Sequence, residues 1–232
     1  MLAARARCWL VISFCLAGPV LGSGCGLTEY EERLEVQQKR LKYMEQENKN
    51  LTDRPVVLSD RVEGIQNKYF FLRLPAGIAV EPAELPPVQR LGRLEIYPAL
   101  KQDAGFQDVL IALAVEEDRE KDKEKFLKDV FNRLKISGSP KTKQIPPRPF
   151  DKPLRYDVYQ GSNLQLYVPQ NSKYLTAIAF RLTGSGNTAA IEERINFCLA
   201  SLLEGKSAEA PRKLLQAQSR KKSKEKKADK GD

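Results

Sequence analysis

The segment 154–169, LRYDVYQGSNLQLYVP, restricts the fold of this chain more than any other. Two runs rich in tyrosine, valine and leucine flank the residues QGSN at 160–163, where glycine and asparagine favour a tight turn. Strands joined by so short a turn must run antiparallel. A third alternating segment, 173–184, follows at once. The sequence therefore predicts a mainly antiparallel sheet.

Further strands are expected at 68–77, 93–99 and 106–117, the last apolar enough to lie inside the sheet. A helix is predicted at 118–137 and another from about Asn187–Thr188, each with one apolar face. The first helix's face is Phe126, Leu127, Val130, Phe131 and Leu134; the second's is Ile191, Ile195, Cys198, Leu199, Leu202 and Leu203. The proline-rich residues 144–153 are predicted to be a stiff connector, with a peptide-like docking segment as the alternative.

These elements predict an α+β fold: a mainly antiparallel sheet of about six strands, covered by two helices, in two or three layers. The element order is β-β-β-α-β-β-β-α. We expect this domain to span residues 68–205 and a linker to occupy 55–67. Cys198 falls on the apolar face of the last helix, so we interpret it as a core residue rather than a reactive thiol.

A long helix precedes the domain, within residues 25–54. Leu27, Tyr30, Leu34, Gln37, Leu41, Met44, Asn48 and Leu51 follow a heptad spacing, with Leu27 at position a. A capping box at Thr28 and Glu31 predicts the start, and Pro55 predicts an end near Thr52–Asp53. Two interpretations stay open. The helix either self-associates through Leu34, Leu41, Met44 and Asn48, or it is a spacer that stays solvated or packs on the domain.

Composition excludes several classes of catalytic site. The chain has no histidine, so a Ser-His-Asp or Cys-His mechanism and a His-rich zinc site are ruled out. The acids Asp108, Glu116, Glu117 and Asp118 lie near a strand end and are the candidates for a carboxylate-based enzyme. Such acids are more typical of a solvated boundary. We therefore expect no catalytic residue, no cofactor and no metal.

Residues 1–24 have the pattern of a secretory signal peptide. Arg5 and Arg7 precede an apolar run, and small residues follow a break at Gly18 and Pro19. The run is shorter than the roughly 20 residues that a transmembrane helix needs. The expectation is export; an anchor that stays uncleaved is the alternative.

Residues 21–25, LGSGC, resemble the lipobox of bacterial lipoproteins, in which a cysteine receives diacylglycerol and becomes the new N-terminus. The resemblance implies lipid attachment at Cys25. It also implies a location on the cell membrane or the outer membrane, facing the periplasm. Ordinary signal peptidase would accept the small residues here too, so a soluble exported protein is the alternative.

The domain resembles the PsbP-like and Mog1-like fold, which also occurs in small lipoproteins of the DcrB and LpqN type. The residues that carry the resemblance are FFLRLPAG (70–77), YDVYQGSNLQLYV (156–168) and YLTAIAFRLTGSGNTAAIEERINFCLASL (174–202). The resemblance covers roughly 68–205. It implies a binding or assembly-factor domain and assigns no functional residue.

The formal net charge of +9 belongs mostly to the last part of the chain. Residues 206–232 hold ten Lys/Arg against four Asp/Glu and few apolar residues, which predicts a disordered basic tail. The tail either contacts an anionic lipid or polymer surface or only aids solubility. No nucleic acid is expected, since aromatic residues are not interleaved with the basic ones. The lysines concerned are Lys221, Lys222, Lys224, Lys226 and Lys227.

Together these patterns predict a non-enzymatic cell-envelope lipoprotein that acts as a binding, scaffolding or assembly-factor module. One alternative is a soluble exported adaptor that oligomerises through the N-terminal helix. The other is the carboxylate-based enzyme.

Overall fold

The computed structural model describes residues 24–57, 70–83, 93–100, 105–114, 119–149, 151–172, 174–184 and 187–204. The chain divides into two compact units, Met1–Gln46 and Glu47–Asp232. The predicted leader up to residue 23, most of the predicted linker, and the predicted basic tail lie outside the described residues.

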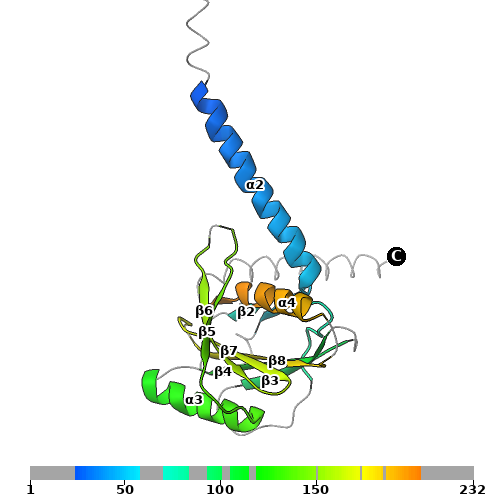
Figure 1. The fold of residues 1–232 in the computed structure, drawn as a ribbon, viewed down its shortest axis with the longest axis vertical. Helices are drawn as coiled ribbons and strands as arrows, with labels where there is room; N and C mark the ends of the chain where they lie inside the picture. The colour runs from blue at the N-terminus through cyan, green and yellow to red at the C-terminus, as the bar shows by residue number, and fades with distance from the viewer. Residues whose placement is uncertain are drawn as a thin grey trace, which may run out of the picture. The chain divides into compact units, whose positions relative to one another are not determined.

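Helix α2 spans Gly24–Asn50, so the long N-terminal helix is confirmed (Figure 1). The predicted start at a Thr28–Glu31 capping box is wrong, because the helix already runs through Thr28 from Gly24. Extending a formed helix by a turn adds one hydrogen bond per residue and no new nucleation cost. The helix ends at Asn50, and Leu51 then forms an antiparallel bridge with Pro75.

The main sheet has six antiparallel strands in the order β3-β4-β8-β7-β6-β5. Its members are β3 (Arg93–Pro98), β4 (Phe106–Ala114), β5 (Lys141–Ile145), β6 (Leu154–Gln160), β7 (Leu164–Pro169) and β8 (Leu175–Leu182). The predicted hairpin is confirmed: β6 pairs with β7, Gln160 lies opposite Gln165, and the Gly161 amide donates to the Leu164 carbonyl at 2.8 Å. The α+β class and the antiparallel sheet are as the sequence predicts.

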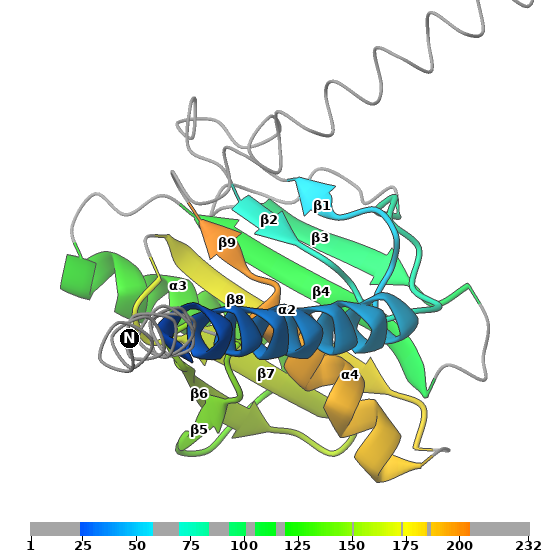
Figure 2. The ribbon, with the colours of Figure 1, turned by 90° about the horizontal axis from the view of Figure 1, so that it is seen from above.

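Helices cover both faces of this sheet. Helix α3 (Arg119–Leu134) lies on one face, and α4 (Thr188–Ala200) lies on the other (Figure 1). A second sheet, in the order β1-β2-β9, shares the α4 side (Figure 2). Its strands are β1 (Val56–Val57), β2 (Phe70–Leu72) and β9 (Leu203–Glu204). The domain is therefore built in three layers with the six-stranded sheet in the middle.

Because both faces are covered, neighbouring residues of one strand enter different cores. On β8, Ile178 and Phe180 join the core under α4, while Ala177 and Ala179 join the core under α3. The α3 core receives Phe126 and Val130, as the predicted apolar face requires. This is why β8 is buried at six consecutive residues instead of alternating with solvent.

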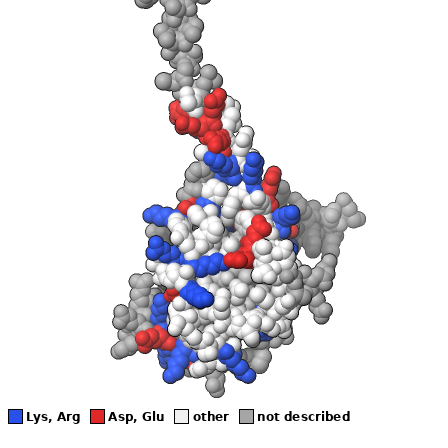
Figure 3. Space-filling view, viewed as in Figure 1, with Lys and Arg blue, Asp and Glu red and all other residues white. Residues whose placement is uncertain are grey.

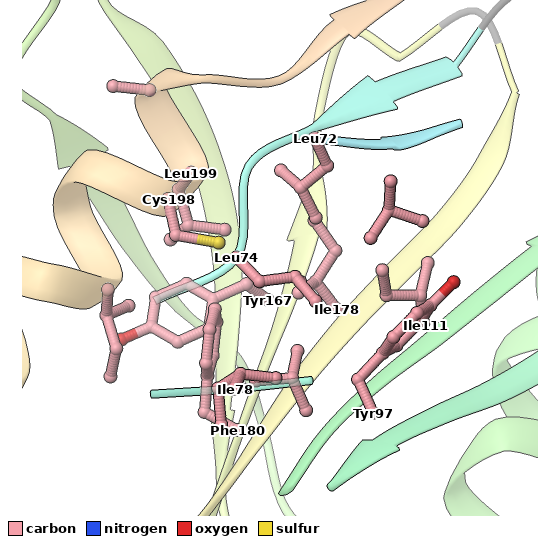
Figure 4. Close-up of a cluster of buried hydrophobic side chains, with 14 of the residues drawn as sticks. Leu72, Leu74, Ile78, Tyr97, Ile111, Tyr167, Ile178, Phe180, Cys198 and Leu199 are labelled. Carbon is pink, nitrogen blue, oxygen red and sulfur yellow. The ribbon is translucent and has the colours of Figure 1, made fainter. Parts of the chain in front are cut away.

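Cys198 lies in the α4 core, as predicted. Its side chain is 0% exposed and points toward Leu74 and Tyr167 (Figure 4). Burial raises the pKa of the Cys198 thiol far above its ordinary value, so the thiol stays protonated at neutral pH. The predicted start of α4 is also confirmed, since Asn187 is the N-cap and its side chain accepts from the Ala189 amide.

Four strands differ from the prediction. Lys141–Ile145 forms β5, whereas the sequence predicts a stiff connector from residue 144 onward. Val56–Val57 falls within the predicted linker, yet it forms β1 and pairs with β2. Strand β9, which the sequence does not predict, follows α4 and also pairs with β2. The predicted strand 68–77 is shortened to β2, in the second sheet, and β5 completes the main sheet in its place. All four depend on pairing partners that are remote in sequence or on an open sheet edge.

Candidate functional site

A groove of about 400 Å³ lies between the first half of α4 and the strands β5, β6, β7 and β8. Apolar side chains form much of its lining, and polar groups lie among them. The apolar residues are Val158, Tyr167, Leu182, Ile191 and Ile195; the polar ones are Lys141, Lys143, Gln160, Gln165, Thr188 and Glu192. Its volume and its mixed lining are typical of sites for small ligands.

The groove exists because only the second half of α4 packs closely against the sheet. The helix is anchored by its second half, where Ile195, Cys198 and Leu199 are buried. Ile191, one turn earlier, is only partly buried, and Thr188 is exposed. The first turns of α4 therefore form a wall of the groove instead of filling it.

Lys143 spans the groove from β5 to α4. Its Nζ donates to Glu192 Oε1 at 2.7 Å and lies 5.9 Å from the centre of the Tyr167 ring. The pair is partly open to solvent, so it is weak and can exchange for a ligand. Lys143 thus places a cation directly over an aromatic side chain.

Lys141 lies two residues earlier on the same side of β5, opposite Val158. None of the described residues forms an ion pair with it. It also borders a second hollow of about 130 Å³, shared with Tyr159 and Gln160. Lys141 is therefore an exposed cation at the rim of the groove, whereas Lys143 is partly buried within it.

Tyr167 lies at the base of the groove and holds its hydroxyl in a defined direction. The hydroxyl donates to Gln165 Oε1 at 2.8 Å. Burial, with a smaller effect of the Glu192 charge, raises the pKa of Tyr167 far above its ordinary value. The phenol stays protonated at neutral pH, so the base of the groove carries no charge.

Figure 3 shows the distribution of charged side chains on one face of the domain. A broad uncharged area is bordered by a row of Lys/Arg and Asp/Glu side chains across the middle of the domain. Charged side chains on this face therefore gather in a band, and the area beside the band carries few of them.

The sequence-predicted site residues lie elsewhere. Cys25 falls in α2, and nothing is described of its side chain. Leu34, Leu41 and Met44 are exposed on α2. Glu116, Glu117, Asp118 and the lysines Lys221, Lys222, Lys224, Lys226 and Lys227 lie outside the described residues. The groove was missed because Lys141 and Lys143 share a face only once β5 is known to be a strand.

Asp108, one of the predicted acids, is part of an ion pair in the sheet and lies away from the groove. It is 7% exposed and lies opposite Arg181, whose Nη1 donates to Asp108 Oδ2 at 2.9 Å. Burial raises the pKa of Asp108, and the Arg181 charge lowers it by less. The pKa of Asp108 therefore lies above its ordinary value.

This raised pKa gives a pH-dependent stability. A folded carboxyl with a raised pKa binds a proton more readily than the unfolded one, so its ionisation costs stability as pH rises above the ordinary Asp value of about 3.9. We expect wild type to gain stability relative to Asp108→Asn as pH falls through that window. Urea unfolding of both proteins at several pH values measures this. If wild type instead lost stability relative to Asp108→Asn as pH falls, the Arg181 charge would have a larger effect on the pKa of Asp108 than burial.

The chain matches no protein-family model and no curated protein sequence. Within the described residues, no helix has both the length and the apolar character needed to cross a membrane. The same residues contain no group of three or more acids or cysteines arranged to hold a metal ion.

Proposed function

We propose that this chain is an exported, lipid-anchored binding module of a bacterial cell envelope, without enzymatic activity. Cys25 carries the lipid, α2 is the spacer, and the α+β domain binds its ligand in the groove beside α4. The leader and the LGSGC segment support the anchor. The lysine-bearing apolar groove is the observation that carries the binding role.

The chemistry of the groove suggests an amphipathic ligand with one acidic group. Val158, Tyr167 and Ile191 offer apolar contacts, and the acidic group would replace Glu192 as the partner of Lys143. Lys141 adds a second charge at the rim. The basic tail would assist at an anionic envelope surface, where each basic residue contributes about 1 kcal/mol.

A fluorescent long-chain fatty acid is a suitable probe of the groove. We expect saturable binding to the whole exported protein, weakened about tenfold by Lys143→Met, because a charge-assisted contact is lost. Lys125→Met, on exposed α3 surface, is the matched control and should bind like wild type. The corresponding fatty alcohol should be indifferent to Lys143→Met.

Ile191→Trp tests the position of the site, since the larger side chain fills the groove from α4. It should abolish binding of both the acid and the alcohol while the protein still melts cooperatively. Unchanged binding in Ile191→Trp, or the absence of saturable binding in wild type, would refute the groove as the ligand site.

The anchor is tested separately by mass spectrometry of the mature N-terminus after membrane fractionation. The proposal expects a diacylglyceryl-modified Cys25 in the membrane fraction and release of the protein by Cys25→Ser. An unmodified N-terminus on a protein that leaves the membrane without detergent would contradict the anchor and leave the binding role to the previous test.

A further inference from the structure

A row of large apolar side chains on α2 is open to solvent. Tyr30 is 60% exposed, Leu34 43%, Leu41 59% and Met44 54%. They lie four, seven and three residues apart, which places them on one stripe of a helix, with Gln37 in the gap. We call these five residues the α2 stripe. Such a stripe on a helix is the surface that a second helix covers in a coiled coil.

The structure limits this stripe at its C-terminal end. The heptad spacing continues to Asn48 and Leu51, but both belong to the domain. Leu51 is 2% exposed in the α4 core, and Asn48 Oδ1 accepts from Arg73 Nη1 at 3.0 Å. The interface available to another helix is therefore Tyr30 to Met44. The Asn48 side chain is occupied and does not set the register.

The charges beside the stripe identify its occupant. In heptad terms Arg33, Arg40 and Glu47 take position g, whereas Glu31 and Glu45 take position e. Glu47 is bound to Arg73 and Arg148 of the domain, so only the two arginines at g can face another helix. A parallel second copy brings g next to the e that lies five residues later, which pairs Arg40 with Glu45 of the other copy, twice by symmetry. An antiparallel copy brings g next to g and e next to e, so arginine meets arginine and glutamate meets glutamate.

We infer that α2 pairs with α2 of a second copy of this chain, parallel and in register, through the α2 stripe. The two Gln37 side chains meet in the middle, where their amides hydrogen-bond to each other and oppose a slipped register. The interface covers little more than two heptads, so it is weak in solution. This inference does not depend on the groove.

Charge reversal tests both the pairing and its direction in the whole exported protein carrying Cys25→Ser. Arg40→Glu should weaken dimerisation about tenfold, as measured by sedimentation equilibrium over a wide concentration range. The residues three and four positions from Arg40 are Val36, Gln37, Tyr43 and Met44, so the substitution removes no ion pair with an acidic residue at helical spacing. Combining Arg40→Glu with Glu45→Arg should restore wild-type affinity. Stronger dimerisation of Arg40→Glu alone would overturn the parallel direction.

Disulfide cross-linking is a second test of the parallel pairing of α2. Under copper–phenanthroline oxidation, Leu41→Cys should cross-link to the same residue of a second copy, because a positions face each other in a parallel pair. Lys39→Cys, on the opposite side of α2, is the matched control and should cross-link far more slowly. Buried Cys198 does not compete. A monomeric wild type at all concentrations, or equal cross-linking at both positions, would overturn the inference.

Discussion

Phe180→Ala is expected to lower the free energy of unfolding by about 3–5 kcal/mol. Phe180 is 0% exposed on β8, near the middle of the main sheet. Its ring lies 5.6 Å from the Tyr167 ring and 6.1 Å from the Phe106 ring, centre to centre. Alanine would leave a cavity that these rings, themselves buried on neighbouring strands, have little freedom to fill.

Urea unfolding followed by circular dichroism measures the Phe180→Ala effect. Phe131→Ala is the matched control: Phe131 contacts Tyr159 at 4.6 Å between ring centres but is only partly buried on α3. The free energy of unfolding should fall clearly less in Phe131→Ala than in Phe180→Ala. Comparable losses at the two positions would show that the sheet centre relaxes around the missing ring.

Glu47→Gln has the second largest expected effect, a loss of about 2–4 kcal/mol. Glu47 Oε1 accepts from Arg148 Nη2 at 2.7 Å and from Arg73 Nη1 at 3.4 Å. Its side chain is 8% exposed, against 14% for Arg73 and 23% for Arg148. Glutamine keeps the shape but leaves two largely buried guanidinium groups without a carboxylate.

The same substitution should loosen the end of α2. Thr52 donates its amide to the Leu74 carbonyl, and Asn50 accepts from the Ala76 amide, both at 2.8 Å. Hydrogen exchange at the Thr52 and Ala76 amides should accelerate in Glu47→Gln beyond the global loss of stability. Adding Arg148→Met to Glu47→Gln should recover part of the loss, since one unpaired charge is removed. If the double variant were instead less stable than Glu47→Gln by the full effect of Arg148→Met alone, the broken ion pair would not explain the loss of stability in Glu47→Gln.

Local signals account for the elements that were predicted well. The hairpin at 154–169 needed only its alternation and its Gly-Ser-Asn turn, and α4 needed only Asn187 before an apolar face. Helix α3 was recognisable because Phe126 and Val130 recur at helical spacing. In each case the residues that decide the structure are within a few positions of one another.

The missed strands show the limit of such signals. β5 is KTKQI, a polar sequence that becomes a strand because β6 presents an open edge to it. β2 and β9 pair Phe70 with Glu204 from opposite ends of the domain. The groove has the same origin, since its lining residues come from four strands and one helix and meet only after the sheet is assembled.

The heptads of α2 show which features follow from the sequence alone and which depend on the tertiary structure. The order of residues alone decides that Leu34, Leu41, Met44 and Leu51 lie on one stripe, because helical periodicity is a local property. Only the tertiary structure decides that Leu51 belongs to the core while Met44 stays exposed. The reason is that burial depends on what else reaches that point: Pro75 bridges to Leu51, and Arg73 and Arg148 bind Glu47 from distant parts of the chain.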